Sequence, residues 1–262
     1  MVSSNKNIAL CFDADYTLLE GYHPSIILDK RGVDVEKFWE KVTSLQQAEK
    51  SKGEKTNVDI IYLACFMHEV RYGKLNGLTI EEIRSYGKDL EKMCYPGIPD
   101  FFDKIKKTNP DYKISNNIIS VGMKDLLMGS CLGQYMDNVL GYTFFDNLTE
   151  DKGIDEVKST VSSSEKVSMI VAISDGSYET GFEFPIKDMI YFGDGQTDVP
   201  AFKFVKKRGG TSICVFNPKT KGAYAKADRF RPSVDYVLPA DYRENSDLGC
   251  TVNEIINRTI WV

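Results

Sequence analysis

Ile8-Ala9-Leu10-Cys11-Phe12 is an apolar run that leads directly into Asp13-Ala14-Asp15-Tyr16-Thr17-Leu18. The run has the length and composition of a buried strand, and residues two apart in an extended backbone point the same way. In open α/β sheets, ligands bind at the carboxyl ends of the strands. The sequence therefore predicts that Asp13 and Asp15 converge on one ligand at the end of a strand.

A second strand end of the same kind lies in the C-terminal half of the chain. Met189-Ile190-Tyr191-Phe192 is followed by Gly193-Asp194-Gly195-Gln196-Thr197-Asp198. Carboxylates gathered in one pocket repel one another unless a cation lies between them. Mg²⁺ fits best, because it takes one or two carboxylates with water and substrate phosphate, and the sequence has no dense His/Cys cluster for zinc.

Composition limits the classes of protein that this chain can represent. It has 262 residues, a net charge of −5 and 42% hydrophobic residues, which fits one large domain or a domain with an insertion and excludes a disordered protein. The mildly acidic balance argues against a nucleic-acid binder. We expect no membrane association, because no apolar stretch approaches membrane-spanning length. The sequence carries no signal of an oligomeric state.

The six cysteines are scattered, and none forms a Cys-x-x-Cys pair. Several lie inside apolar runs, as reduced cysteines in a protein core do. The polar N-terminus does not match a signal peptide. These features predict a cytoplasmic protein.

The segment between Leu19 and Tyr95 has helical character. Helices are expected over 34–46, over 58–72 and from the capping-box sequence Thr79-Ile80-Glu81-Glu82 to about residue 93, with a charged linker over 49–55. We therefore expect an α-helical cap over 20–95 and an α/β core formed by 1–19 and 96–262.

The remainder of the chain alternates between strand and helix. Strands are expected over 112–120, 139–145, 189–192 and 211–216, and helices over 99–107, 123–136, 164–173, from about 199, over 219–227 and from 248. Strands separated by helices predict a Rossmann-like, doubly wound parallel sheet with helices on both faces.

The chain resembles the haloacid dehalogenase-like phosphohydrolase superfamily. Asp13-Ala14-Asp15-Tyr16-Thr17 is similar to its first motif, Asp-x-Asp-x-Thr, and Gly193-Asp194-Gly195-Gln196-Thr197-Asp198 to its fourth. Ile118-Ile119-Ser120 ends a strand as the second motif does. The helical segment over 20–95 lies where the superfamily often inserts a cap, so the resemblance spans the whole chain.

The resemblance implies a role for each motif residue. Asp13 would attack phosphorus and form an aspartyl-phosphate, and Asp15 would protonate the leaving alcohol. Mg²⁺ would be held by Asp13, the Asp15 backbone carbonyl and Asp194. Asp198 would bind the ion through water, orient its neighbours, or cap the following helix.

The second and third motifs would supply the groups that hold the phosphoryl oxygens. Ser120 and the backbone of Gly122 would donate hydrogen bonds to these oxygens, while Thr17 would fix the first loop; Ser120 judged alone could equally be a turn residue. The third motif requires a lysine that offsets anionic charge. Lys166 is the candidate, because it opens a helical segment before the Asp194 strand, and Lys152 and Lys158 are its rivals.

Asp15 points to phosphomonoesters among the reactions of the superfamily, since members that release halide lack an acid at this position. Ser120-Val121-Gly122 and the cap placement are similar to the phosphoserine-phosphatase-like branch. In that branch a glutamate of the cap binds the amine of the substrate. This sequence has no clear counterpart, because Glu20 comes too early in the chain and Tyr22 lies nearer the expected position of the glutamate. Tyr16 would narrow the loop, touch the substrate or pack under the cap.

The leading hypothesis is a Mg²⁺-dependent phosphatase that acts on a small phosphorylated metabolite. A phosphotransferase or phosphomutase, and a catalytically silent binding protein with the same fold, are the alternatives. Four polar residues of the cap segment are candidates for facing the substrate: His23, His68, Arg71 and Arg84.

Overall fold

The computed structural model describes residues 6–53, 58–146, 148, 153–178 and 183–258. Within these residues the strands form one seven-stranded sheet of order β4-β3-β2-β1-β5-β6-β7. All neighbouring strands are parallel except β3 and β4. The strands are β1 (Lys6–Phe12), β2 (Tyr112–Met123), β3 (Asn138–Phe145), β4 (Glu156–Ser159), β5 (Met189–Gly193), β6 (Thr211–Phe216) and β7 (Tyr236–Pro239).

Helices precede or follow nearly every strand. The α-helices are α1 (Ser25–Lys30), α2 (Val35–Ser51), α3 (Val58–Tyr72), α4 (Ile80–Tyr86), α5 (Asp100–Thr108), α6 (Lys124–Met128), α7 (Glu165–Ser174), α8 (Val199–Lys207), α9 (Ala223–Asp228) and α10 (Asp247–Arg258). Short 3₁₀ helices are η1 (Gly87–Met93), η2 (Gly133–Tyr135), η3 (Ile186–Asp188), η4 (Gln196–Asp198) and η5 (Arg231–Ser233).

The central strand β1 is buried on both faces. Ile8, Leu10 and Phe12 belong to a hydrophobic cluster that also contains residues of α5 and α10, while Ala9 and Cys11 belong to a second cluster with residues of α7 and α8. The alternation follows from the two-residue period of a strand. The predicted α/β class, with a largely parallel sheet covered on both faces, is confirmed.

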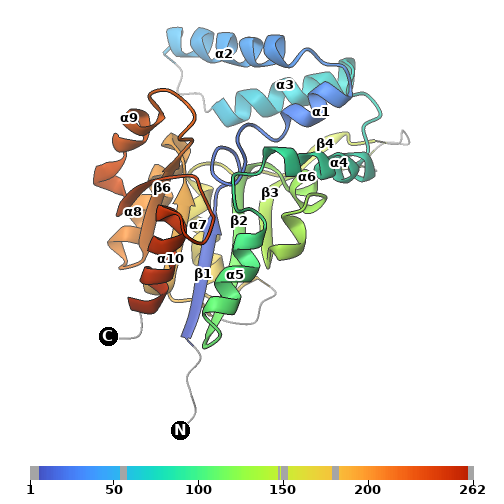
Figure 1. Cartoon of the computed structure of the whole chain (residues 1–262). Helices are drawn as coiled ribbons and strands as arrows, with labels where there is room; N and C mark the ends of the chain where they lie inside the picture. The colour runs from blue at the N-terminus through green and yellow to red at the C-terminus, as the bar shows by residue number, and fades with distance from the viewer. Residues whose placement is uncertain (1–5, 54–57, 147, 149–152, 179–182, 259–262) are drawn as a thin grey trace.

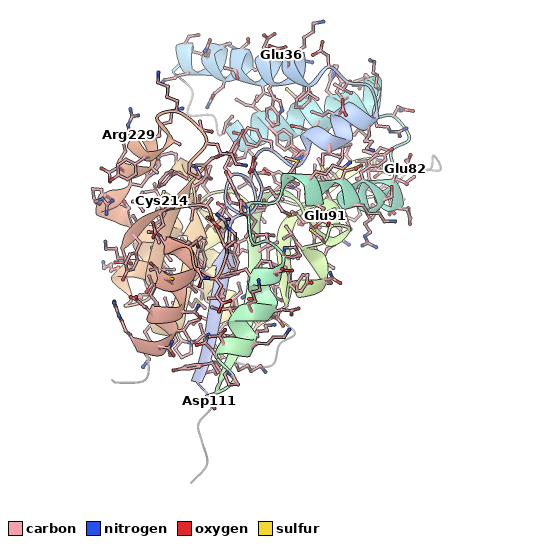
Figure 2. The ribbon with its side chains drawn as sticks, viewed as in Figure 1. Glu36, Glu82, Glu91, Asp111, Cys214 and Arg229 are labelled. Atoms are coloured by element: carbon pink, nitrogen blue, oxygen red, sulfur yellow. The ribbon has the colours of Figure 1, made fainter. Side chains whose placement is uncertain are left out.

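Helices α1, α2 and α3 lie beyond the carboxyl ends of the central strands, on the side opposite both chain termini (Figure 1). The buried apolar residues of these helices belong to the same hydrophobic cluster as Ile8, Leu10 and Phe12. The outer surface of this layer is polar, and Glu36 at the start of α2 points away from the sheet (Figure 2). This layer therefore covers the strand ends on which the predicted site residues stand.

Several predicted elements match the structure closely. Helix α3 and strand β6 have the predicted bounds, and Thr79 forms the predicted capping box with Glu82. The helix that begins there continues after Tyr86 as the 3₁₀ helix η1. Helix α2 extends to Ser51 into the expected charged linker, of which residues 54–55 lie outside the described part.

Two predicted segments are wrong in their extent. The expected helix over 123–136 is a continuation of strand β2 to Met123, then α6, which ends at its C-cap Gly129, then η2. Glycine is a poor helix former, so Gly129 and Gly133 weaken a continuous helix here. The expected helix over 219–227 begins only at Ala223. The sheet also carries an antiparallel edge strand, β4, which the sequence did not predict.

In the described residues no helix combines the length and apolar character that a membrane span requires. The six cysteines are free, and the sulfur atoms of Cys94 and Cys131 lie 3.7 Å apart.

Candidate active site

The register of the central strands brings the two acidic motifs together. Phe12 of β1 pairs with Ile118 of β2 on one side and with Phe192 of β5 on the other. Asp13 therefore follows one residue after this row and Asp194 follows two residues after it. The backbone N–H of Asp13 also donates to the carbonyl of Phe192 over 2.9 Å. The sequence predicted this convergence from the shared edge of parallel strands.

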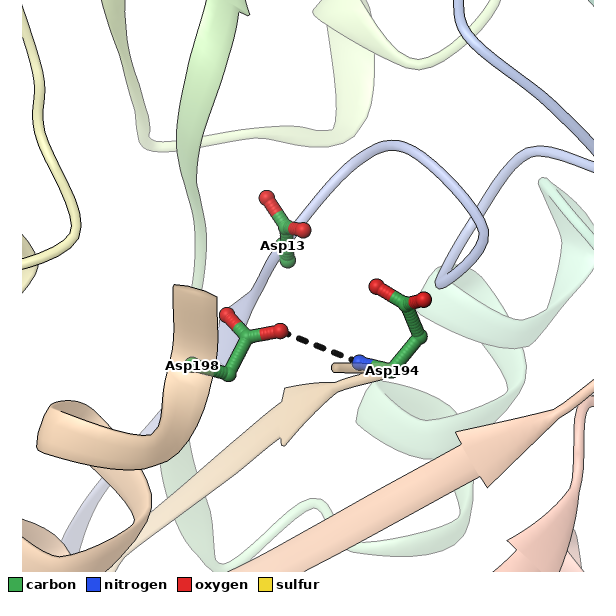
Figure 3. Close-up of side chains that lie close together, drawn as sticks. All are labelled: Asp13, Asp194 and Asp198. Atoms are coloured by element: carbon green, nitrogen blue, oxygen red, sulfur yellow. Dashed lines mark hydrogen bonds between the residues drawn. The ribbon is translucent and has the colours of Figure 1, made fainter. Parts of the chain in front are cut away.

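Asp13, Asp194 and Asp198 form a cluster in which one carboxylate oxygen of each lies within 4.8 Å of the others (Figure 3). Asp13 and Asp198 are buried and Asp194 is partly exposed. Oxygen atoms of converging carboxylates are the ligands that a hard divalent cation takes. The donor set therefore fits the predicted Mg²⁺. The carboxylate of Asp15, for which the sequence predicted the role of acid and only a backbone contact to the ion, lies outside this cluster.

Both carboxylate oxygens of Asp198 are occupied by protein donors. Oδ1 accepts hydrogen bonds from Lys166 Nζ over 2.7 Å and from the Tyr191 hydroxyl over 2.8 Å. Oδ2 accepts from the backbone N–H groups of Asp194 and Gly195. The Asp198 side chain makes no capping hydrogen bond to α8. This arrangement favours the orienting role for Asp198 and leaves Asp13 and Asp194 as the carboxylates of the cluster that could bind a cation.

Lys166 joins the two carboxylates at the base of the cluster. Its side chain is fully buried, and Nζ lies 3.0 Å from Asp13 Oδ1 and 2.7 Å from Asp198 Oδ1. Its rival Lys158 is exposed and lies over the ring of Phe145, and Lys152 lies outside the described residues. The geometry therefore favours Lys166 as the lysine of the third motif.

Burial and like charges change the acidity of the cluster. Desolvation, together with the attraction of Lys166 that opposes it and the charges of Asp198 and Asp15 that add to it, brings the pKa of Asp13 to about 7. Desolvation followed by the charges of Asp198 and Asp13 raises the pKa of Asp194 well above its usual value. Without additional positive charge these carboxylates hold protons more tightly than ordinary ones, and a bound cation would displace those protons.

Asp15 is held in place by a histidine that the sequence left unassigned. Asp15 Oδ1 lies 2.6 Å from His23 Nδ1 and accepts the backbone N–H of His23 over 2.7 Å. The other ring nitrogen, Nε2, accepts the backbone N–H of Met123 over 2.9 Å. Because an amide N–H can only donate, Nε2 carries no proton, and the neutral ring donates from Nδ1 to Asp15.

His23 also explains a glycine of the second motif. A Cβ atom on Gly122 would lie 1.9 Å from His23 Cε1, so only glycine leaves room for the ring. Among the other cap candidates, His68 is exposed, Arg71 pairs with Glu156 and Arg84 pairs with Asp125. Neither spacing nor composition singles out His23, because its function depends on contacts with residues 8 and 100 positions away.

The predicted phosphate-binding residues are buried at the ends of β1 and β2. The Ser120 hydroxyl accepts the backbone N–H of Gly122 over 3.0 Å, so these two predicted donors bond to each other. The Thr17 hydroxyl has no hydrogen-bond partner among the described residues, while its carbonyl accepts the Tyr242 hydroxyl. The Tyr242 hydroxyl therefore holds the loop that follows β1 through the backbone of Thr17.

Tyr16 adopts a left-handed backbone conformation with φ of 56°. A non-glycine residue pays a steric cost of about 1–2 kcal/mol in this region. The Tyr16 ring contacts the ring of Tyr22 edge to face, with centroids 5.0 Å apart. The aromatic contact at the start of the cap segment offsets part of that strain.

We predict that His23→Ala lowers kcat about 10- to 100-fold with a smaller change in KM, because Asp15 loses the ring that orients it. Unfolding is expected to become easier by about 1–3 kcal/mol, since the buried Met123 N–H loses its acceptor. Steady-state kinetics on an aryl phosphate and thermal melting measure the two effects. His68→Ala, which changes the second of the two histidines, is the matched control and should behave as wild type. A wild-type kcat in folded His23→Ala would refute the positioning role.

No known family model matches this sequence. An uncharacterized protein of Borreliella burgdorferi is 27% identical over 245 residues, which cover 82% of this chain and 85% of that protein.

Several solved structures are similar over nearly the whole chain. A substrate-bound phosphoserine phosphatase has a TM-score of 0.61 and 17% identity, covering 96% of this chain and 99% of that one. A phospho-aspartyl intermediate analogue of phosphoserine phosphatase has a TM-score of 0.60 and 18% identity, covering 95% of this chain and 99% of that one. A HAD family hydrolase from Salmonella enterica serovar Typhi has a TM-score of 0.62 and 16% identity, covering 96% of this chain and 72% of that one. The chain therefore has the haloacid dehalogenase-like fold in the form seen in phosphoserine phosphatases, as the sequence motifs predicted.

Proposed function

We propose that this protein, which has the haloacid dehalogenase-like fold, is a Mg²⁺-dependent phosphatase that hydrolyses a small phosphomonoester through an aspartyl-phosphate. The observation that carries the proposal is the meeting of Asp13, Asp194 and Lys166 at adjoining strand ends. A carboxylate nucleophile, a cation site and a fixed ammonium group are the parts that displacement at an anionic phosphorus requires.

Asp13 attacks phosphorus with one carboxylate oxygen, and the bond from phosphorus to the leaving alcohol breaks. Asp15 gives its proton to that alcohol and then takes a proton from the water that hydrolyses the aspartyl-phosphate. His23 holds Asp15 Oδ1, which leaves Oδ2 to exchange the proton; in the described part of the chain Oδ2 accepts no hydrogen bond. Mg²⁺ held by Asp13, Asp194 and the Asp15 carbonyl would neutralise charge on the phosphoryl oxygens.

We also propose that residues 20–95 form a cap that closes over this site. The chain leaves the core and returns to it side by side: the Glu20 N–H donates to the Met93 carbonyl and the Tyr95 N–H donates to the Leu18 carbonyl. The adjacent exit and return support a boundary at Leu19 and Tyr95. Helix α4 packs closely on α6, where a Cβ on Gly129 would lie 1.9 Å from the Arg84 carbonyl oxygen. Motion of the cap would therefore be centred on α1 to α3.

The proposal is tested by release of free phosphate from a panel of phosphorylated metabolites. We expect turnover with Mg²⁺, loss of turnover with excess chelator and recovery when Mg²⁺ is added back, because the carboxylates need a cation to accept a phosphoryl group. Product analysis distinguishes the reactions, since phosphate transferred to a sugar indicates a phosphotransferase or mutase. Mg²⁺ binding without turnover of any ester would indicate a catalytically silent protein.

We also propose a cytoplasmic location, with which the six free cysteines are compatible.

A further inference from the structure

A small pocket adjoins Asp15 and Gly122 on the side of the cap. Its volume is about 60 Å³, and its walls include Tyr22 and Trp39 from the cap as well as the two site residues. If Asp15 protonates the leaving oxygen, that oxygen lies within hydrogen-bond reach of its carboxyl group. The rest of the alcohol then extends into this pocket.

The volume limits the size of that alcohol. Pockets for drug-sized ligands measure about 300–1,000 Å³. A pocket of about 60 Å³ therefore suits only a group of a few non-hydrogen atoms. This is the size of a two- or three-carbon alcohol with one further polar group.

The charged side chains among the described lining residues of the pocket are all acidic. Asp15 and Asp59 both contribute to the wall, and none of the described lining residues is lysine, arginine or histidine. Desolvation raises the pKa of the Tyr22 hydroxyl, and the charges of Asp15, Asp194 and Asp59 raise it further, with no cation acting against them. A second anionic group on the substrate would face two carboxylates here, and none of the described lining residues would offer it a positive charge.

Two polar groups in the pocket are suited to a hydrogen-bond donor. Asp59 is 7% exposed in the first turn of α3; the Tyr142 hydroxyl donates to its backbone carbonyl over 3.4 Å, and the Ser163 hydroxyl donates to its Oδ2 over 3.5 Å. The Tyr62 hydroxyl is buried and has no hydrogen-bond partner among the described residues. A buried hydroxyl without a partner is costly, which favours a ligand that supplies one.

Aromatic side chains form the remaining wall. The rings of Tyr22, Trp39 and Tyr62 stack in sequence with centroids 4.7 and 5.3 Å apart. Such a rigid wall suits the short carbon chain between the phosphate and a polar end group.

We propose that this pocket selects the phosphate ester of a small amino alcohol that carries an ammonium group and no carboxylate, with Asp59 as the residue that reads the ammonium group. The inference rests on the proposed phosphatase function and assigns its substrate class. It separates this protein from a phosphoserine phosphatase by chemistry although the folds are alike, because a serine carboxylate would find no cationic side chain among the described lining residues.

The test compares three phosphate esters that differ in charge. Phosphoethanolamine carries the ammonium group, phosphoserine adds a carboxylate to it, and propyl phosphate lacks both. We expect kcat/KM for phosphoethanolamine to exceed each of the other two values at least tenfold, since a charge-assisted hydrogen bond discriminates by about this factor.

Two variants connect the preference to the pocket. Asp59→Asn keeps the size of the side chain and removes its charge, and should lower the ratio of kcat/KM for phosphoethanolamine to that for propyl phosphate about tenfold. Tyr62→Phe removes only the unpartnered hydroxyl, so its fold is retained, and should lower the same ratio several-fold. Glu36→Gln, on the outer face of the same helical layer, is the charge-matched control and should leave the ratio unchanged (Figure 2).

Equal rates on the three esters, or a preference for phosphoserine, would overturn this inference while the phosphatase function stands. If the protein releases phosphate neither from these three esters nor from any other ester, the proposed function is overturned and this inference with it. A tenfold preference that survives in folded Asp59→Asn would remove Asp59 as the reading residue.

Discussion

Asp13→Asn is expected to lower kcat by roughly 10⁴-fold or more while the protein stays folded. Asparagine has the shape of aspartate, but its amide cannot attack phosphorus to give an acyl-phosphate. Lys166 keeps its second partner, Asp198, at 2.7 Å, so the buried ammonium is not left alone. A fall of four powers of ten corresponds to about 5.5 kcal/mol of activation free energy.

The same substitution separates activity from stability. Burial raises the pKa of Asp13 from 3.8 to about 7, so its contribution to folding is most favourable below pH 3.8 and is lost as the pH rises to about 7. Above pH 7 the charged carboxylate costs of order 4 kcal/mol in the metal-free protein. Asp13→Asn removes this cost, and its melting temperature above pH 7 without metal should equal or exceed that of wild type. Retained turnover in this variant would refute the mechanism.

Lys166→Met is expected to remove turnover and to destabilise the protein by about 3–5 kcal/mol, because two buried carboxylates lose their shared cation. The destabilisation should shrink as the pH falls, since Asp13 can then be protonated. Kinetics and thermal melting at several pH values measure both effects.

Lys158→Met is the matched control, because Lys158 is an exposed lysine that the sequence also nominated for this role. It should retain wild-type rate and stability. Lys152→Met tests the remaining rival. If Lys166→Met turns over substrate normally and Lys152→Met does not, the assignment of the third motif is wrong.

Local sequence signals predicted the elements that depend on periodicity. Helix α3 carries a broad apolar pattern and β6 a short apolar run, and both have the expected bounds. The meeting of Asp13 with Asp194 was also predictable, since it follows from the common edge of parallel strands.

The elements and contacts that depend on distant neighbours were not predictable. Helix α1 has six residues and no side-chain cap, and β4 is a four-residue strand that lies beside β3 at the edge of the described sheet. His23 acquires its function from Asp15 and Met123, which lie on different elements. Asp59 carries no signal in the sequence that singles it out, and in the structure it is buried and lines the same pocket as Tyr22, Trp39 and Tyr62.

The most direct test of the account is the site of covalent phosphorylation. A single turnover of wild-type protein with Mg²⁺, quenched in acid and digested, should place one phosphoryl group on the peptide that contains Asp13, and none should appear with excess chelator. A phosphoryl group on another residue, or rapid release of phosphate with Asp13 never modified, would contradict the proposal that Asp13 is the nucleophile at a cation-dependent site.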